Sequence, residues 1–333
     1  MATLKDIAKL AGVSYTTVSL VLNGKSKERS ISQQTQEKVF AAAQQLQYVT
    51  NIAAKRLKTT KSNHYTIAVY WPADYRMSFI SRLIDGMKKA IDEMSDPVDI
   101  IIRPYKNDFL CDDTELADGT SYHGAIISGA SNADMEYLER TTFAIPIVVL
   151  NRTTSKYSTV GTNNYNAGRL AALHLISRGY TDITTVFTQN PFTAMHEHQI
   201  SFLQTCQEHN CSIKNQFISK NSISGGFEIA SEILKEPLPQ VIFFDTDAIA
   251  RGFLCAANMA GKNIPKDVSV LAMGVYSPES SSYTVPPLST VDIPHELFAQ
   301  YGLKLLIGSI KKELVQPCHL TFDAELKTRS SCQ

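Results

Sequence analysis

The 333-residue chain is predicted to fold as an α-helical head followed by an α/β body of two doubly wound, parallel-sheet lobes. Three observations lead to this prediction. Apolar residues recur at helical spacing near the N-terminus, and strands rich in branched residues alternate with amphipathic helices from Tyr65 onward. The alternating part is also too long for a single sheet with one core.

The head begins with two short helices separated by a glycine. Thr3 is placed to cap the first helix, Gly12 to end it in a left-handed conformation, and Ser14 to cap the second. The dipeptide at 23–24, Asn-Gly, ends that helix. Two helices joined in this way form a helix-turn-helix. The expected inward faces consist of Leu4, Ile7, Ala8, Ala11, Val18, Val21 and Leu22.

A third helix follows, with Ile31 before it and Ser32 as its N-cap. Its apolar stripe is short and consists of small and medium side chains, so the three helices bury only a modest core. The stripe comprises Val39, Ala42, Ala43 and Leu46.

Charge is distributed unevenly although the whole chain has no net charge. Residues 1–62 carry ten Lys and Arg against three acids, which leaves 22 bases and 29 acids for the rest. A basic end with a strong apolar pattern on an acidic body indicates a small domain that meets nucleic acid. A solvated, lysine-rich tail would explain the charge but not the apolar pattern.

The composition excludes several classes of protein. With 44% apolar and 19% charged residues the chain is expected to be globular, and no apolar run is long enough for a membrane helix or a signal peptide. We therefore expect a cytoplasmic protein. The six cysteines have no zinc or redox spacing and are interpreted as reduced thiols. We expect no cofactor and no metal.

The second helix leaves hydrogen-bonding side chains on its outer face. In a helix-turn-helix this helix enters the major groove and its N-terminal side chains reach base edges, while amides at the helix starts near Thr3 and Ser14 hold phosphates. An ordinary solvent-exposed helix is the alternative. The expected base-reading side chains are Tyr15, Thr16, Ser19 and Asn23.

The stretch from TLKDIAKLAGVSYTTVSLVLNG through ISQQTQEKVFAAAQQLQYVTNIAAKRLK resembles the headpiece of the LacI/GalR family of bacterial transcription regulators. The resemblance implies a recognition helix at 15–22. That family usually has an arginine where this chain has Leu20, so Leu20 is expected to touch a thymine methyl or to leave its base unread. We extend the expected DNA contacts to Leu4 and Thr17.

The same resemblance implies a hinge helix at 51–58. Eight residues do not form a stable helix alone, so this segment should fold only when it gains partners. In the family, paired hinge helices enter the minor groove and a leucine inserts between base pairs; Leu57 matches that leucine and Ala54 permits the close approach. A plain linker is the alternative. Asn51 and Lys55 complete the predicted contacts.

The body resembles the family's effector domain, which is similar to periplasmic sugar-binding proteins. The matching motifs are IPIVVLNR, YNAGRLAALHLISRGYTDI, DAIARG, DVSVLAMG and YTVPPLSTVDIP. The expected boundaries are a headpiece at 1–50, a hinge helix and linker at 51–60, and an effector-binding and dimerisation domain at 61–333. Within the last, we expect an N-lobe at about 64–161 and 292–320 and a C-lobe at about 162–291 and 321–333.

The resemblance places effector contacts at Phe79, at Asn151 and Arg152 after a strand, and at Asp247. An aromatic face suits a sugar ring or a base, an arginine suits hydroxyl pairs or anions, and a carboxylate suits sugar hydroxyls. His198, where the family has an arginine, is a further candidate. Phe79 and Trp71 could instead be core, and His196 with His198 form an incomplete metal site.

Several positions depart from the family pattern, and these departures leave the identity of the effector open. Where the family usually has Asp-Asn, this chain has Asn163-Asn164, and where the family has Gly-Phe-Asp-Asp, it has Ala272-Met273-Gly274-Val275. Thr246 stands in place of the family's asparagine before the cleft aspartate.

The function expected from these observations is a ligand-responsive, sequence-specific repressor of carbohydrate-utilisation genes. It would bind a pseudo-palindromic operator in double-stranded DNA as a homodimer, and a sugar or related metabolite would be its effector. A protein or phosphorylated-metabolite corepressor is the alternative. A solute-binding protein would have no use for the head, and no nucleophile, base or metal motif supports an enzyme.

Overall fold

The computed structural model describes residues 3–22, 26, 31–46, 64–74, 80–189 and 192–332. The chain divides into two compact units, one within residues 1–60 and the other within 61–333. No helix in the described ranges is long and apolar enough to cross a membrane.

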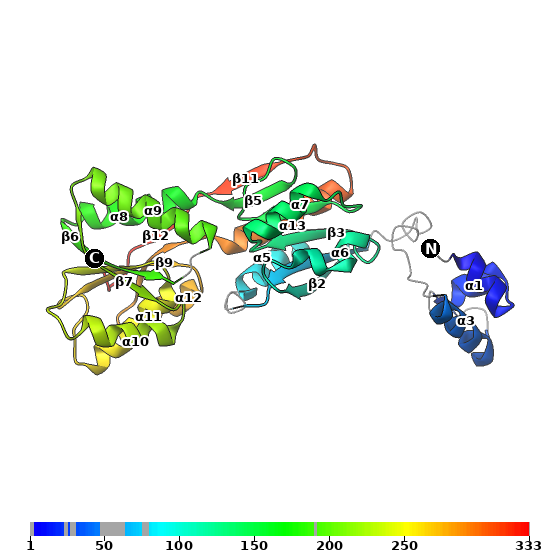
Figure 1. Ribbon diagram of the computed structural model, residues 1–333, viewed down its shortest axis with the longest axis horizontal. Coiled ribbons are helices and arrows are strands. Elements are labelled where there is room, and N and C mark those ends of the chain that lie inside the picture. The colour runs from blue at the N-terminus through cyan, green and yellow to red at the C-terminus, as the bar shows by residue number, and fades with distance from the viewer. Residues whose placement is uncertain are drawn as a thin grey trace. The chain divides into compact units, whose positions relative to one another are not determined.

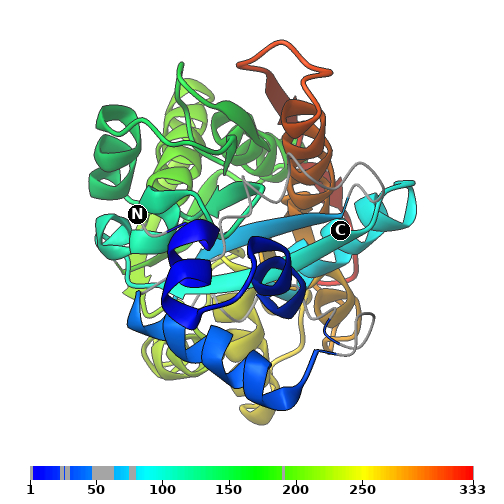
Figure 2. The same ribbon diagram turned by 90° about the vertical axis from the view of Figure 1, so that its right-hand side faces the viewer.

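In its described residues the first unit has three helices packed around one small core, drawn in blue in Figure 2. They are α1 (Leu4–Ala11), α2 (Tyr15–Leu22) and α3 (Gln33–Gln45). The buried side chains are those predicted from the helical spacing, which confirms the inward faces. They are Ile7, Val18, Val21, Val39, Ala42 and Ala43.

The predicted caps of these helices are confirmed. The Thr3 hydroxyl accepts a hydrogen bond from the Asp6 amide, and the Asp6 carboxylate accepts one from the Thr3 amide at 2.8 Å, so α1 starts with a capping box. Gly12 ends α1 at φ 65°, in the left-handed region. The Ser14 hydroxyl accepts from the Thr17 amide at 3.1 Å and opens α2.

The second unit contains two six-stranded sheets, each the centre of one lobe (Figure 1). The first sheet has the order β11-β5-β4-β3-β1-β2, and the second has the order β12-β10-β9-β8-β6-β7. All pairings are parallel except that of β10 with β12. The first sheet comprises β1 (Tyr65–Pro72), β2 (Val98–Tyr105), β3 (Gly124–Ser128), β4 (Ile147–Leu150), β5 (Ser158–Thr162) and β11 (His319–Phe322).

The remaining strands and the helices of the body complete the two lobes. The second sheet comprises β6 (Asp182–Thr188), β7 (Ser212–Ser219), β8 (Val241–Phe244), β9 (Ser269–Gly274), β10 (Ser289–Asp292) and β12 (Glu325–Lys327). The helices are α5 (Ile80–Asp92), the 3-10 helix η3 (Leu110–Asp112), α6 (Thr114–Asp118), α7 (Asn132–Arg140), α8 (Asn164–Ser177), α9 (Thr193–Glu208), α10 (Ile223–Ile233), α11 (Asp247–Met259), α12 (Pro278–Ser282) and α13 (His295–Ile310).

Helices cover both faces of each sheet because successive strand side chains point to opposite sides. In β1, Val69 and Trp71 join the cluster that contains α5 and α13, whereas Ala68 and Tyr70 join the cluster that contains α6 and α7. The predicted fold class, a helical head and a body of two doubly wound lobes, is therefore confirmed.

Glycines allow helices to pack backbone against backbone in both lobes. A Cβ on Gly86 of α5 would lie 2.0 Å from the Glu296 carbonyl oxygen of α13, and one on Gly168 of α8 would lie 2.1 Å from the His198 carbonyl oxygen of α9. Gly226 of α10 stands in the same relation to Ile249 of α11. Any other residue would push these helices apart, so the glycines fix the spacing of three helix pairs.

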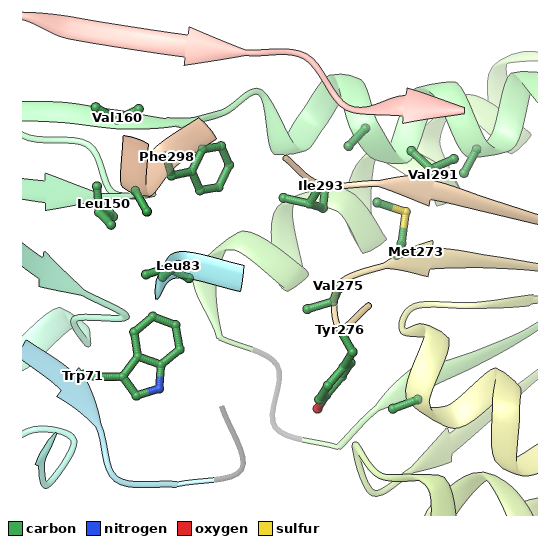
Figure 3. Close-up of a cluster of buried hydrophobic side chains, with 14 of the residues drawn as sticks. Trp71, Leu83, Leu150, Val160, Met273, Val275, Tyr276, Val291, Ile293 and Phe298 are labelled. Carbon is green, nitrogen blue, oxygen red and sulfur yellow. The ribbon is translucent and has the colours of Figure 1, made fainter. Parts of the chain in front are cut away.

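The junction between the lobes is both apolar and polar. Figure 3 shows Leu83 and Phe298 of the first lobe facing Ile293 and Val275 at the strand ends of the second. Beside them the buried Arg82 guanidinium donates to the carbonyls of Val275 and Ile293, each at 2.8 Å. One arginine thus bonds to both strand ends.

Candidate functional site

The outer face of α2 is the predicted recognition surface. Tyr15 and Thr16 are exposed, and Ser19 and Leu20 are half-buried, whereas Val18 and Val21 point into the head. Leu20 is not among the side chains that form or flank the core of this unit. The helix therefore presents a ring, hydroxyls and one apolar side chain to its surroundings, as the sequence predicts.

The side chains predicted to contact DNA differ in the contacts that they already make within the head. The Ser14 and Thr17 hydroxyls lie 2.8 Å apart and bond to each other. Thr16 makes no side-chain hydrogen bond within the described residues of the head, so its hydroxyl is available to a ligand. Leu4 packs against the core, which gives it a structural role in addition to the one predicted.

Some predicted contacts lie outside the residues that the structure describes. For DNA these are Asn23, Asn51, Ala54, Lys55 and Leu57, and for the effector it is Phe79.

A cavity of about 680 Å³ lies in the body and receives residues from both lobes. Its size falls within the range of small-molecule sites. Its polar lining includes Asn151, Arg152, Thr162, Thr193, Glu197 and His319. The structure therefore brings two of the predicted effector residues, Asn151 and Arg152, into one cavity.

Asn151 and Arg152 are held in place by backbone contacts. Asn151 follows β4 at φ 53°, a left-handed conformation that asparagine tolerates, and its side-chain oxygen accepts from the Thr162 amide at 3.3 Å. The Arg152 guanidinium donates to the carbonyls of Ala130 at 2.6 Å and of Asn151 at 2.7 Å. These bonds orient both side chains at the carboxyl end of the sheet, where ligands bind in such folds.

The opposite wall of the cavity comes from the second lobe. Glu197 of α9 accepts a hydrogen bond from the Asn164 side chain at 3.0 Å. Asn163, the other residue of the altered Asp-Asn pair, caps α8 by accepting from the Asn166 amide at 2.9 Å. Sequence reasoning did not identify Glu197 because a single glutamate in a helix carries no motif.

Asp247 has a different environment from the one predicted. Its fully buried carboxylate accepts from the backbone amides of Val275 at 3.1 Å, Tyr276 at 3.0 Å and Ser277 at 3.4 Å. Burial raises its pKa, although these amides and the charge of Arg251 act in the opposite direction. Asp247 thus holds the segment after β9 against the start of α11 and does not line the cavity.

A second buried carboxylate, Asp245, joins three elements of the second lobe. It accepts from the Thr188 amide at 2.7 Å and from the Gln199 side chain at 2.6 Å. Burial raises its pKa to about 6 despite these bonds. In the sequence FFDTD two carboxylates, Asp245 and Asp247, directly follow a buried strand. This pattern could have indicated that both carboxylates are buried and hydrogen-bonded.

His198 lies in the core between α8 and α9 and is not among the cavity residues. Burial lowers its pKa to about 3, so it is neutral at physiological pH. Its Nε2 is buried and has no hydrogen-bond partner. Among the described residues no group of three His, Cys, Asp or Glu side chains could hold a metal ion.

Comparison with protein families assigns both parts of the chain. Residues 3–51 match the model of bacterial regulatory proteins of the lacI family, and residues 172–332 match a periplasmic binding protein-like domain.

Individual proteins are similar over nearly the whole chain. The probable HTH-type transcriptional repressor ExuR of Bacillus subtilis is 29% identical over 99% of this chain and 98% of its own length. A LacI family transcription regulator from Clostridium acetobutylicum is 31% identical, covering 80% of this chain and 99% of that structure, with a TM-score of 0.76. The lac repressor dimer, bound to operator and the anti-inducer ONPF, is 23% identical over 99% of this chain and 98% of its own, with a TM-score of 0.70.

The environment of Asp247 predicts a structural role. Replacing it with alanine leaves three buried amides without an acceptor, and we expect the free energy of unfolding of the body to fall by about 3 kcal/mol. Urea unfolding followed by fluorescence measures this. The exposed Asp85→Ala variant is the control and should change stability by less than about 0.5 kcal/mol. Unchanged stability in Asp247→Ala would show that the carboxylate does not support this segment.

Proposed function

Because the chain belongs to the lacI family of bacterial regulatory proteins, we propose that it represses its genes as an effector-controlled homodimer on a pseudo-palindromic operator. It is a DNA-binding transcriptional repressor with no enzymatic activity. The observation that carries the proposal is the exposed face of α2, with Tyr15 and Thr16 outward on a head whose core is complete.

In this proposal α2 lies in the major groove. Thr16 and Ser19 bond to base edges or phosphates, Tyr15 contacts a base or sugar with its ring, and Leu20 contacts a thymine methyl. The capped starts of α1 and α2, at Thr3 and Ser14, place backbone amides against phosphates. Asn23, Asn51, Ala54, Lys55 and Leu57 remain proposed contacts.

One head makes few base contacts, so specific binding calls for two heads on matched half-sites. The body offers a surface for such pairing in its second lobe. Large apolar side chains are exposed there on α10, at the end of α11 and after α12, where a monomer gains nothing from them. They are Ile223, Phe227, Met259, Tyr283 and Val285.

The effector is proposed to bind in the cavity that contains Asn151, Arg152 and Glu197. The polar walls offer one cation, one carboxylate and several amides and hydroxyls, a set that suits a sugar or related polyhydroxy metabolite. A phosphorylated metabolite or a protein corepressor is the alternative. Phe79 and His198 are proposed effector residues by resemblance alone, and so is Asp247.

Control of DNA binding follows as a population shift. Since the cavity has walls from both lobes, an effector favours one arrangement of the lobes over another. We propose that this moves the attachment points of the segments at 51–58, so that Leu57 enters or leaves the minor groove. Because its target is operator DNA, the protein is proposed to act in the cytoplasm, on carbohydrate-utilisation genes.

Thr16→Ala tests the recognition helix. Specific duplexes are first selected from random DNA with the full-length protein, and affinity is then measured by fluorescence anisotropy at several salt concentrations. Loss of one base or phosphate contact should weaken specific binding by about 1–3 kcal/mol, because the Thr16 hydroxyl makes no side-chain hydrogen bond to the part of the head that the structure describes. Specific binding by the wild type should also weaken steeply with salt.

Gln34→Ala, an exposed change on α3, serves as the control and should leave affinity unaltered. Failure to enrich any duplex would refute the proposed function, and equal affinities of wild type and Thr16→Ala would remove Thr16 from the interface.

Glu197→Gln tests the effector cavity. In a thermal-shift screen of sugars and sugar derivatives, a ligand at one hundred times its Kd should stabilise the wild type by about 2.7 kcal/mol. The substitution removes one strong acceptor and should weaken that ligand at least tenfold. Glu228→Gln, on the surface of α10, is the matched control. A ligand that binds Glu197→Gln as tightly as wild type does not use this cavity.

A further inference from the structure

Two buried cysteines meet at a turn in the second lobe. Cys206 lies in the last turn of α9, and Cys211 directly precedes β7. Both are free thiols; Cys206 is fully buried and Cys211 is 6% exposed, while the turn that joins them, residues 207–210, is exposed. Neither lines the effector cavity. They are the only two of the six cysteines that lie within ten residues of each other in the sequence.

The backbone of the turn brings the two cysteines together. The Cys211 amide donates to the Cys206 carbonyl at 2.8 Å, and Asn210 adopts a left-handed conformation, at φ 54°, that turns the chain back. With standard bond lengths this hydrogen bond limits the separation of the two Cα atoms to about 6.6 Å at most. Disulfides in proteins join Cα atoms that are about 4.4–6.8 Å apart. The backbone therefore already has the separation that a disulfide requires.

The two side chains also interact with each other. Burial raises the pKa of both thiols, to about 12 for Cys206. The hydrogen bond between them adds to this effect at Cys206 and opposes it at Cys211, as expected when the Cys206 thiol donates to the Cys211 sulfur. The Cys211 thiol in turn donates to the Tyr180 carbonyl at 3.3 Å. The sulfur atoms thus face each other, and both thiols are protonated at neutral pH.

We propose that Cys206 and Cys211 are a redox-sensitive pair that forms an intramolecular disulfide when the protein meets hydrogen peroxide. Cys211 is nearer to the surface and reacts first: its thiolate bonds to one peroxide oxygen, the O–O bond breaks, and a sulfenic acid and water result. The Cys206 thiolate then attacks the Cys211 sulfur, the S–O bond breaks, and a second water leaves. The two thiols lose two electrons and two protons, which convert the peroxide to two water molecules.

The disulfide would act on the helix that borders the effector cavity. An S–S bond of about 2.05 Å is shorter than the contact of two unbonded sulfur atoms, so its formation draws the end of α9 toward β7. The Tyr180 carbonyl also loses its thiol donor. At the other end of α9, Thr193 and Glu197 line the cavity, and Gln199 donates to Asp245. This consequence rests on the proposed effector cavity, whereas the formation of the disulfide does not.

Peptide mapping of the folded, full-length protein tests the proposal. The protein is treated with hydrogen peroxide, the remaining thiols are alkylated, and disulfides are located by mass spectrometry. We expect a disulfide between Cys206 and Cys211 that dithiothreitol removes. Because only thiolates react and burial keeps both pKa values high, its rate of formation should rise about tenfold between pH 7 and pH 8. Hydrogen exchange of the α9 amides should change on oxidation.

Cys206→Ala and Cys211→Ala should each abolish the disulfide and the change in hydrogen exchange. Cys111→Ser, at an exposed cysteine, is the matched control and should retain both. The proposal is wrong if peroxide oxidises Cys111 in the wild type without joining Cys206 to Cys211. It is also wrong if the two are joined only in urea, since the disulfide then belongs to the unfolded chain. Unchanged exchange of the α9 amides in the oxidised wild type would refute the effect on the helix.

Discussion

The arrangement of the two lobes depends on the buried guanidinium of Arg82. It extends from α5 in the first lobe to the carbonyl of Val275 after β9 and to that of Ile293 after β10. Its other hydrogen bonds go to both carboxylate oxygens of Glu296 on α13, each at 2.7 Å. Burial opposes ionisation of Glu296, but the bonds from Arg82 outweigh it and lower its pKa. An arginine is required here because only a guanidinium donates in so many fixed directions.

Other features of the junction support the position of Arg82 between the lobes. Gly86 lets α5 approach the backbone of α13 beside Glu296, which brings the arginine within reach of its acceptors. Asp247 fixes the amides of Val275 and Tyr276, so the carbonyl that Arg82 uses belongs to a segment already held in place. The effector cavity also has walls from both lobes, so a ligand bound there would act on the arrangement of the lobes that Arg82 holds. This arrangement gives a repressor a physical route from a small molecule to a change in lobe geometry.

Much of this structure could be predicted from the sequence, and there are physical reasons why some elements could not. Strands buried on both faces, such as Tyr65–Pro72 and Asp182–Thr188, appear as apolar or branched runs. The edge strand Ser212–Ser219 and the short strand Ser158–Thr162 carry no such run, because polar residues and a glycine interrupt them, so their sequences do not indicate a buried strand. The caps and core of the head were predictable because they depend on local spacing.

The sites were harder to predict because they form between distant segments. Asn151 and Arg152 could be placed at a strand end, but their neighbour Glu197 could not. Resemblance assigned a ligand role to Asp247, whereas its carboxylate bonds to amides that lie about thirty residues further along the chain. Arg82 carries no motif, and its importance appears only when the two lobes are seen together.

The central claim is that Arg82 and Glu296 act as one buried unit that holds the lobes. A double-mutant cycle with Arg82→Ala, Glu296→Ala and the double variant tests it, with urea unfolding of the full-length protein as the readout. Arg82→Ala should lower stability by about 3 kcal/mol because it leaves the partly buried Glu296 carboxylate unpaired and removes the donor to the two buried carbonyls of Val275 and Ile293. The double variant should be no less stable than Arg82→Ala alone. Single losses below about 0.5 kcal/mol that simply add would contradict the claim, since exposed ion pairs behave in that way.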